Sequence, residues 1–153
     1  VSITDKADFY IAGEGELESE LKELNSSLGN KVKFSGKVND MYTYLNTAHV
    51  LVNASRTPNE GFPAIITEAG ATNTLVISSD FAGAEDVIIH GVNGLIYKEN
   101  SPDNLCNLMK EVISDFGKYS ALSENFYEFT KKEFSIPVMI EKHISLYNKC
   151  LKK

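Results

Sequence analysis

The chain has 153 residues, 42% of them hydrophobic, which is enough to bury one core, and we interpret residues 1–153 as a single domain. Its net charge of −6 argues against nucleic-acid binding, and it has no apolar run of about 18 residues that would predict a membrane-spanning helix. Cys106, Cys150 and the three histidines are scattered without metal-ligand spacing. We therefore expect reduced thiols in a cytoplasmic protein and no bound metal.

Short apolar segments alternate with segments of helical periodicity over the first two thirds of the chain. Strands are expected at 7–12, which we interpret as buried, and at 31–35, 49–53, 74–78 and 95–97. The first helix ends at Gly29 and has leucines at 17, 21, 24 and 28. A second helix is expected after an N-cap at Asn39 or Asp40, and its inward face carries Met41, Tyr44, Leu45 and Ala48. Further helices are expected from Pro63 to Gly70 and near 85–89.

Three helices are expected after the last strand. The first begins with the cap Ser101 and the proline Pro102, and its inward face carries Leu105, Leu108, Val112, Ile113 and Phe116. The next carries Leu122, Phe126 and Phe129, and the last carries Ile136, Ile140, Ile144 and Tyr147. Residues 117–153 hold 7 lysines and 4 glutamates, whereas residues 1–116 hold 8 basic and 17 acidic side chains. This basic tail could face an anionic membrane, a partner domain or water, and solvated helix faces are the default interpretation.

The alternation of strands and helices predicts an α/β fold with a Rossmann-like, doubly wound parallel sheet, because strands joined through helices run parallel with right-handed crossovers. In such a sheet, ligands bind at the carboxyl ends of the strands. The loops expected at this edge are 13–15, 37–39, 53–60 and 78–83, together with the helix start at Gly61. The sequence therefore predicts one ligand-binding crevice.

The segment Ser55–Gly70 contains the residues most suggestive of ligand binding. Pro63 suits the first helical position, which places Gly61 and Phe62 at the helix start, Glu60 just outside and Glu68 inside. Unpaired N–H groups at such a start favour phosphate, whereas carboxylates accept hydrogen bonds from hydroxyl groups. This combination predicts a nucleotide sugar, which has hydroxyls on either side of its phosphates. From spacing alone, a helix cap and a solvated carboxylate explain the two glutamates equally well, and their place at the expected sheet edge favours the site.

Other ligand-binding and catalytic motifs are incomplete. Gly13-Glu14-Gly15 could begin a dinucleotide fingerprint, but Glu18 stands where the third glycine would be, so a dehydrogenase is disfavoured. We interpret Gly13 and Gly15 mainly as a turn, although they could also let a ligand approach closely. No phosphate-binding Gly-Lys-Ser/Thr motif, Gly-x-Ser-x-Gly elbow or paired Cys and His is present.

Four segments in order carry a resemblance to a known family. Glu60-Gly-Phe-Pro-Ala-Ile-Ile-Thr-Glu68, the strand and turn 74–80, Gly83-Ala-Glu85-Asp-Val-Ile and Gly91-Val-Asn-Gly-Leu-Ile-Tyr97 resemble the C-terminal domain of retaining group-1 glycosyltransferases of the GT-B fold. The resemblance runs from Gly13 to about residue 111. It implies the C-terminal half of such an enzyme, with C-terminal helices.

The resemblance also implies a role for each matched residue. Glu60 would be catalytic and contact donor-sugar hydroxyls, Glu68 would bind the ribose, and Lys37 and Val38 would border the base. The amides of Gly61, Phe62 and Ala64 would hold the distal phosphate. Transfer from a UDP-, GDP- or ADP-sugar to a saccharide or lipid-linked acceptor would retain configuration, need no metal or other cofactor, and rely on stabilising the departing diphosphate.

The implied biological role is synthesis of cell-surface polysaccharide or lipopolysaccharide. Similar enzymes have a Val-Gly-Arg strand and a Lys-Gly, whose cations neutralise the diphosphate, and an N-terminal acceptor domain, none of which this sequence contains. We therefore expect a fragment that binds donor weakly and transfers nothing alone. The full-length enzyme would be cytoplasmic, either free or in peripheral contact with the inner face of the membrane.

Some alternatives remain open at this level. Arg56, the only arginine, could replace a missing cation or contact donor or acceptor, although a solvent-facing or structural role is the default. A second interpretation of the whole chain is a non-catalytic Rossmann-like nucleotide-binding or protein-interaction domain, because fold alone does not establish chemistry. A receiver-like signalling domain would need clustered aspartates after the first strand, where this chain has Gly13-Glu14-Gly15.

Overall fold

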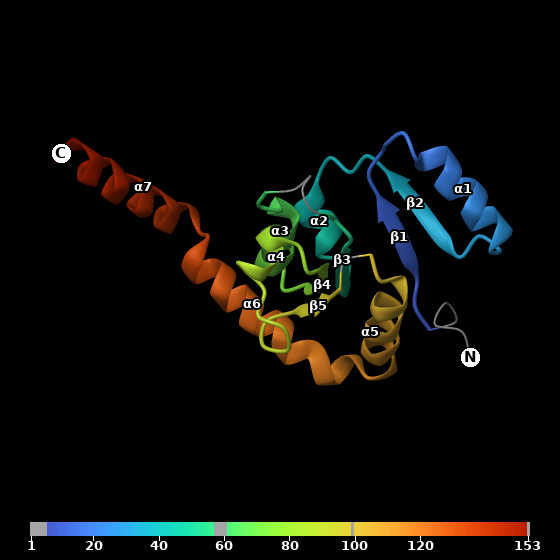
Figure 1. Cartoon of the computed structure of the whole chain (residues 1–153). Coiled ribbons are helices and arrows are strands. Elements are labelled where there is room, and N and C mark those ends of the chain that lie inside the picture. Colours follow the sequence, from blue (N-terminus) through green and yellow to red (C-terminus); the bar gives the residue numbers. More distant parts are fainter. Residues whose placement is uncertain (1–5, 57–60, 99, 153) are drawn as a thin grey trace.

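A computed structural model of the chain describes residues 6–56, 61–98 and 100–152. Strands and helices alternate in it as the sequence predicted (Figure 1). In chain order they are β1 (Phe9–Ala12), α1 (Glu18–Ser27), β2 (Val32–Gly36), α2 (Met41–Leu45), β3 (Val50–Asn53), α3 (Ala64–Ala71), β4 (Leu75–Ser79), α4 (Ala82–Glu85), β5 (Leu95–Tyr97), α5 (Pro102–Ser114), the 3-10 helix η2 (Phe116–Tyr119), α6 (Ser120–Glu133) and α7 (Ile136–Leu151).

The strands form two parallel sheets instead of one continuous sheet. β1 pairs with β2, and β4 pairs with β3 on one side and β5 on the other. Successive strands within each sheet are joined through helices: α1 joins β1 to β2, α3 joins β3 to β4, and α4 joins β4 to β5. The Rossmann-like α/β fold is therefore confirmed, although its strands form two sheets. Within the first sheet, β1 lies nearer to the second sheet than β2 does (Figure 1).

The first sheet is exposed, so the prediction that its first strand is buried was wrong. Tyr10 is 54% exposed, Ile11 is 37% exposed, and the four leucines of the first helix segment are exposed as well. Asn25 ties α1 to β2, because its side chain accepts a hydrogen bond from the N–H of Val32 (3.0 Å) and donates one to the carbonyl of Val32 (2.8 Å). Parallel strands become buried when helices cover both faces of their sheet, and α1 is the one helix that joins this pair.

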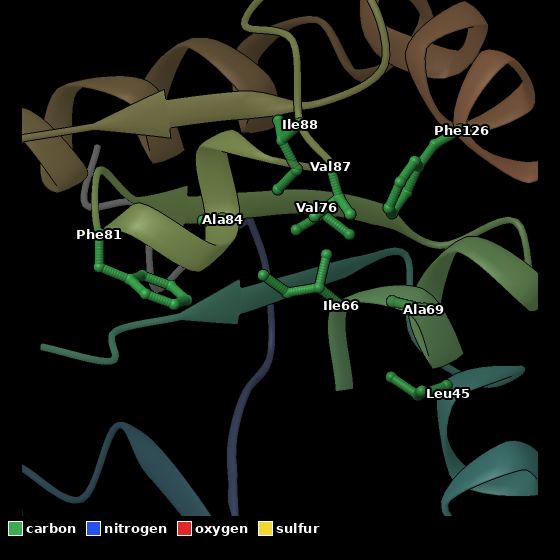
Figure 2. Close-up of a cluster of buried hydrophobic side chains, with 9 residues drawn as sticks. All are labelled: Leu45, Ile66, Ala69, Val76, Phe81, Ala84, Val87, Ile88 and Phe126. Carbon is green, nitrogen blue, oxygen red and sulfur yellow. The ribbon is translucent and has the colours of Figure 1, made fainter. Parts of the chain in front are cut away.

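The second sheet holds the core, and β4 is buried along its whole length. Alternate β4 residues point to opposite faces, so Val76 belongs to one cluster and Leu75 and Ile77 to another. The first cluster, which lies between the sheet and α3, α4 and α6, is Leu45, Ile66, Ala69, Val76, Phe81, Ala84, Val87, Ile88 and Phe126 (Figure 2). The second, on the side of α5 and η2, is Leu75, Ile77, Leu95, Tyr97, Val112 and Tyr119. This part of the fold is doubly wound.

A glycine brings α3 against α6. At Gly70, a Cβ would overlap the Oγ1 of Thr130 and stand 3.0 Å from the ring of Phe126. The Thr130 hydroxyl is buried and has no hydrogen-bond partner among the described residues. The position of α3, which contains Ala64 and Glu68, is therefore fixed by close contact with α6.

Several helix boundaries and faces differ from the sequence predictions. Pro63 is the N-cap of α3 with an extended backbone (φ −80°, ψ 100°), so the helix begins one residue later than expected, at Ala64. α4 lies a few residues before the predicted position. Phe116 is 37% exposed in η2 and not on the inward face of α5. The apolar residues of α7 are exposed because this helix extends away from the body, as Figure 1 shows. The N-cap at Asp40 and the helix start at Pro102 are confirmed.

Candidate functional site

The loops after β1 and β2 lie side by side, as predicted for the carboxyl ends of paired parallel strands. The N–H of Gly13 donates to the carbonyl of Gly36 (2.8 Å), and both glycines have positive φ. The N–H of Lys37 donates to the Glu14 carboxylate (3.3 Å). This N–H, one of the backbone groups expected to border a base, is therefore already hydrogen-bonded within the chain. Gly15 accepts from the N–H of Glu18 (3.1 Å), which supports the interpretation of these glycines as a turn.

Next to this pair of loops, Lys37 is exposed and Val38 is half-buried. Both residues lie between β2 and α2, at the edge where a ligand could reach their backbone. The structure therefore places Gly13, Gly15, Lys37 and Val38 together, as a group on the first sheet.

A buried polar network lies under the corresponding loop of the second sheet. The Asn53 amide donates to the Ser78 hydroxyl (3.3 Å) and its oxygen accepts from the Ser55 hydroxyl (3.0 Å). The hydroxyl of Ser79 donates to the carbonyl of Ser55 (2.6 Å). Asn53, Ser78 and Ser79 are nearly inaccessible to solvent. These bonds tie the end of β3 to the end of β4 and fix the direction in which the chain leaves toward Arg56.

The start of α3 forms the centre of the second group. The first N–H groups of a helix have no acceptor within the helix and carry the positive end of its dipole. Here, at the helix start, the N–H of Ile66 donates to the carbonyl of Pro63 (3.0 Å). The amides of Gly61 and Phe62 precede the helix, and the amide of Ala64 belongs to its first residue. Phe62 is 51% exposed. The position of this helix start beside the carboxyl ends of β3 and β4 suits an anionic group.

Gly83 holds this helix start from the α4 side. A Cβ at Gly83 would overlap the carbonyl oxygen of Gly61 and stand 3.1 Å from its carbonyl carbon. The two backbones can approach this closely only because Gly83 has no side chain. The packing of α4 therefore helps to set the position of Gly61.

The remaining predicted site residues are Glu68, Arg56 and Glu60. Glu68 is exposed on α3, beyond its first turn, and Arg56 is exposed at the last described residue before 57–60. Glu60 lies outside the described residues, so its catalytic role stays a prediction. Among the residues that the structure does describe, no cluster of His, Cys, Asp and Glu could hold a metal ion, and no helix is long and apolar enough to cross a membrane.

The residues that support the site lie in the loops 53–60 and 78–83 expected at this edge, but their supporting role was not predicted from the sequence. The buried network of Asn53, Ser55, Ser78 and Ser79 could have been found from polar residues at the ends of two otherwise apolar strands. Gly83 could not, because its contact with Gly61 depends on how α4 packs. Two surface hollows, one on α6 and one on α7, are not part of the ligand-binding edge of the sheets, because each is lined by a single helix segment. The α7 hollow is lined by Glu141, Ile144, Ser145, Asn148, Lys149 and Lys152.

The fold and this arrangement define a Rossmann-like α/β domain with one group of polar loops after the strands of the first sheet and a second group, with the start of α3, after the strands of the second sheet. The family model described as "Glycosyl transferases group 1" matches residues 2–129. The chain therefore belongs to this family of glycosyltransferases, which confirms the family that its motifs resemble.

Several members and neighbours are similar to the chain over most of its length. It is 30% identical over 146 residues, 95% of the chain, to the Campylobacter jejuni GalNAc-alpha-(1->4)-GalNAc-alpha-(1->3)-diNAcBac-PP-undecaprenol alpha-1,4-N-acetyl-D-galactosaminyltransferase, and covers 40% of that enzyme. It is 27% identical over 143 residues, 89% of the chain, to the GDP-mannose-dependent monoacylated alpha-(1-6)-phosphatidylinositol monomannoside mannosyltransferase of Corynebacterium glutamicum, and covers 37% of it.

Among solved structures, Anabaena HepE in complex with UDP-glucose matches 92% of the chain with a TM-score of 0.81 and 25% identity. The chain covers 40% of HepE. It thus spans about two fifths of the length of each of these three proteins.

Proposed function

We propose that this chain is the donor-binding domain of a retaining glycosyltransferase, the C-terminal half of a GT-B enzyme that transfers sugar from a nucleoside-diphosphate sugar. The observation that carries the proposal is the start of α3. It lies next to the carboxyl ends of β3 and β4, is held by Gly83, and is followed by the exposed carboxylate of Glu68. The HepE complex with UDP-glucose and the GDP-mannose-dependent relative support a nucleotide sugar as the donor class.

In the proposed complex, the amides of Gly61, Phe62 and Ala64 bind the distal phosphate. In this proposal their N–H groups are oriented before the ligand arrives, so that they stabilise the charge that develops on the departing diphosphate without further reorganisation. No metal takes part in this proposal, because the amides and the helix dipole supply the positive potential.

The carboxylates and the first group of loops recognise the rest of the donor. Glu68 accepts hydrogen bonds from the ribose hydroxyls, and Glu60 contacts hydroxyls of the transferred sugar. The base lies against Lys37 and Val38, near the turn of Gly13 and Gly15, while Arg56 faces the sugar or the acceptor.

We further propose that the acceptor, a saccharide or a lipid-linked saccharide of cell-surface polysaccharide synthesis, is bound by another part of a longer enzyme. The chain covers about two fifths of its relatives, and the exposed apolar residues of β1 and α1 are consistent with a neighbouring segment that covers them. The chain alone is then expected to bind donor weakly and to transfer no sugar.

The proposal is tested by titrating the isotope-labelled chain with UDP, GDP and ADP and following backbone amide chemical shifts. We expect shifts at Gly61, Phe62 and Ala64, together with Lys37 and Val38. In Glu68→Ala, affinity should fall about tenfold or more, because a hydrogen bond to a charged group contributes roughly 1.5–3 kcal/mol. Glu141→Ala, which removes an exposed carboxylate of α7, is the matched control and should bind like wild type.

Several results would contradict parts of the proposal. The nucleotide site fails if no nucleotide shifts the amides at the start of α3, or if Glu68→Ala binds as well as wild type. Sugar transfer by this chain alone would contradict its dependence on a longer enzyme. Binding without any transfer by the longer protein would favour the alternative, a non-catalytic nucleotide-binding or protein-interaction domain.

A further inference from the structure

A row of four phenyl rings connects the start of α3 to the hydrophobic core through α6. The ring centroids of Phe62 and Phe134 are 5.4 Å apart, those of Phe134 and Phe129 are 5.8 Å apart, and those of Phe129 and Phe126 are 6.3 Å apart. Phe126 is fully buried, whereas Phe62 and Phe134 are 51% and 38% exposed. The row therefore leads from the buried core to a side chain of the candidate phosphate-binding segment.

The segment that Phe134 contacts, residues 61–63, has few side-chain and N–H groups of its own that could restrain it further, although Pro63 is buried. Gly61 has no side chain, and Pro63 has no N–H to donate. On one side, Gly83 limits how far the Gly61 carbonyl can move. The contact of Phe62 with Phe134 restrains the segment through a side chain, and tilted or edge-on pairs at this ring separation are attractive.

Phe134 is itself held at a defined point of the fold. It is the C-cap of α6, and its N–H donates to the carbonyl of Thr130 (2.9 Å). The neighbouring Glu133 accepts from the ammonium of Lys142 on α7 (3.0 Å), which links the two helices at their junction. The ring of Phe134 is thus presented to Phe62 from the end of α6.

We propose that Phe134 is a positioning residue for donor binding, which holds Phe62 so that the amides of the segment 61–64 face the phosphate before the donor arrives. This inference rests on the proposed function and deepens it. Preorganised amides bind an anion more tightly than amides that must first be ordered, because the ordering cost is already met in the free protein. Phe134 itself is not expected to touch the donor.

The test compares Phe134→Ala, Phe134→Tyr and the control Tyr147→Ala by amide NMR of the full 153-residue chain, first without ligand and then with UDP, GDP and ADP. Tyr147 is an exposed aromatic of α7 that contacts the ring of His143. In Phe134→Ala, we expect lower backbone order parameters at Gly61 and Phe62 and nucleotide affinity reduced about threefold to tenfold. Phe134→Tyr and Tyr147→Ala should behave like wild type.

The outcomes separate this inference from the proposed function. If Gly61 and Phe62 are as ordered in Phe134→Ala as in wild type, or if the folded variant binds with wild-type affinity, the positioning role is overturned while the proposed function stands. If wild type binds none of the nucleotides, both are overturned. A purely structural role would lower the stability of Phe134→Ala without changing the affinity of its folded fraction, and this result also counts against positioning.

Discussion

Gly83→Ala tests how closely the candidate site depends on the packing of α4. The new Cβ would overlap the Gly61 carbonyl oxygen, which would have to move by more than about 1 Å to reach an ordinary C···O separation of about 3.3 Å. The ring of Phe81 is 3.2 Å away on another side, so the methyl group has little room to turn elsewhere. The obstacle is backbone and not the end of a flexible side chain, so relief requires a shift of the segment or of α4.

The expected loss of stability is the difference of two effects. Overpacking of this kind costs about 1–3 kcal/mol, whereas alanine is favoured over glycine in a helix by up to about 1 kcal/mol. We therefore expect the free energy of unfolding to fall by about 1–2 kcal/mol, measured by urea denaturation. Because the displaced group belongs to the proposed phosphate site, nucleotide affinity should fall in the same variant, measured by the amide titration.

Gly117→Ala is the matched control, because it has the same chemistry without the clash. Its Cβ would stand 3.6 Å from the Asp115 side chain, an ordinary contact, in the short helix η2. Its stability should be unchanged or slightly higher. If Gly83→Ala unfolds at the wild-type urea concentration and leaves the Gly61 amide shift unchanged, the close approach of the two backbones does not control the segment.

Two further substitutions test the core and a helix cap. Phe126→Ala should lower the free energy of unfolding, measured in urea, by about 3–5 kcal/mol, because Phe126 is fully buried. The control Tyr127→Ala, on the exposed side of α6, should lower it by about 1 kcal/mol or less. Equal losses in the two variants would contradict the assigned core. Asp40 accepts hydrogen bonds from the backbone N–H and hydroxyl of Thr43, which hold the pKa of its carboxyl below the ordinary value. A lowered carboxyl pKa stabilises the fold above the ordinary pKa and loses this effect as pH falls through the folded value. The stability difference between wild type and Asp40→Ala should thus be constant near neutral pH and shrink below about pH 4; a difference that persists at lower pH would refute the role of the charged cap.

Local sequence patterns determined which elements form and where the candidate site lies. Short apolar and β-branched runs located the five strands and helical spacing located most helices within a few residues, and Asp40 and Pro102 marked helix starts correctly. These features depend on the backbone preferences and hydrogen bonds of neighbouring residues, which the sequence contains directly. The place of Gly61 at the start of α3 follows from the same local chemistry.

Only the tertiary structure decided which elements are covered and what supports the site. β1 and α7 have apolar residues suited to burial, yet these residues are exposed, because α1 is the helix that joins the two strands of the first sheet and because α7 extends beyond the body (Figure 1). The approach of Gly83 to Gly61 and the contact of Phe134 with Phe62 join residues far apart in the chain. Such contacts depend on how packed elements meet in space, so a periodic pattern within one segment carries no information about them.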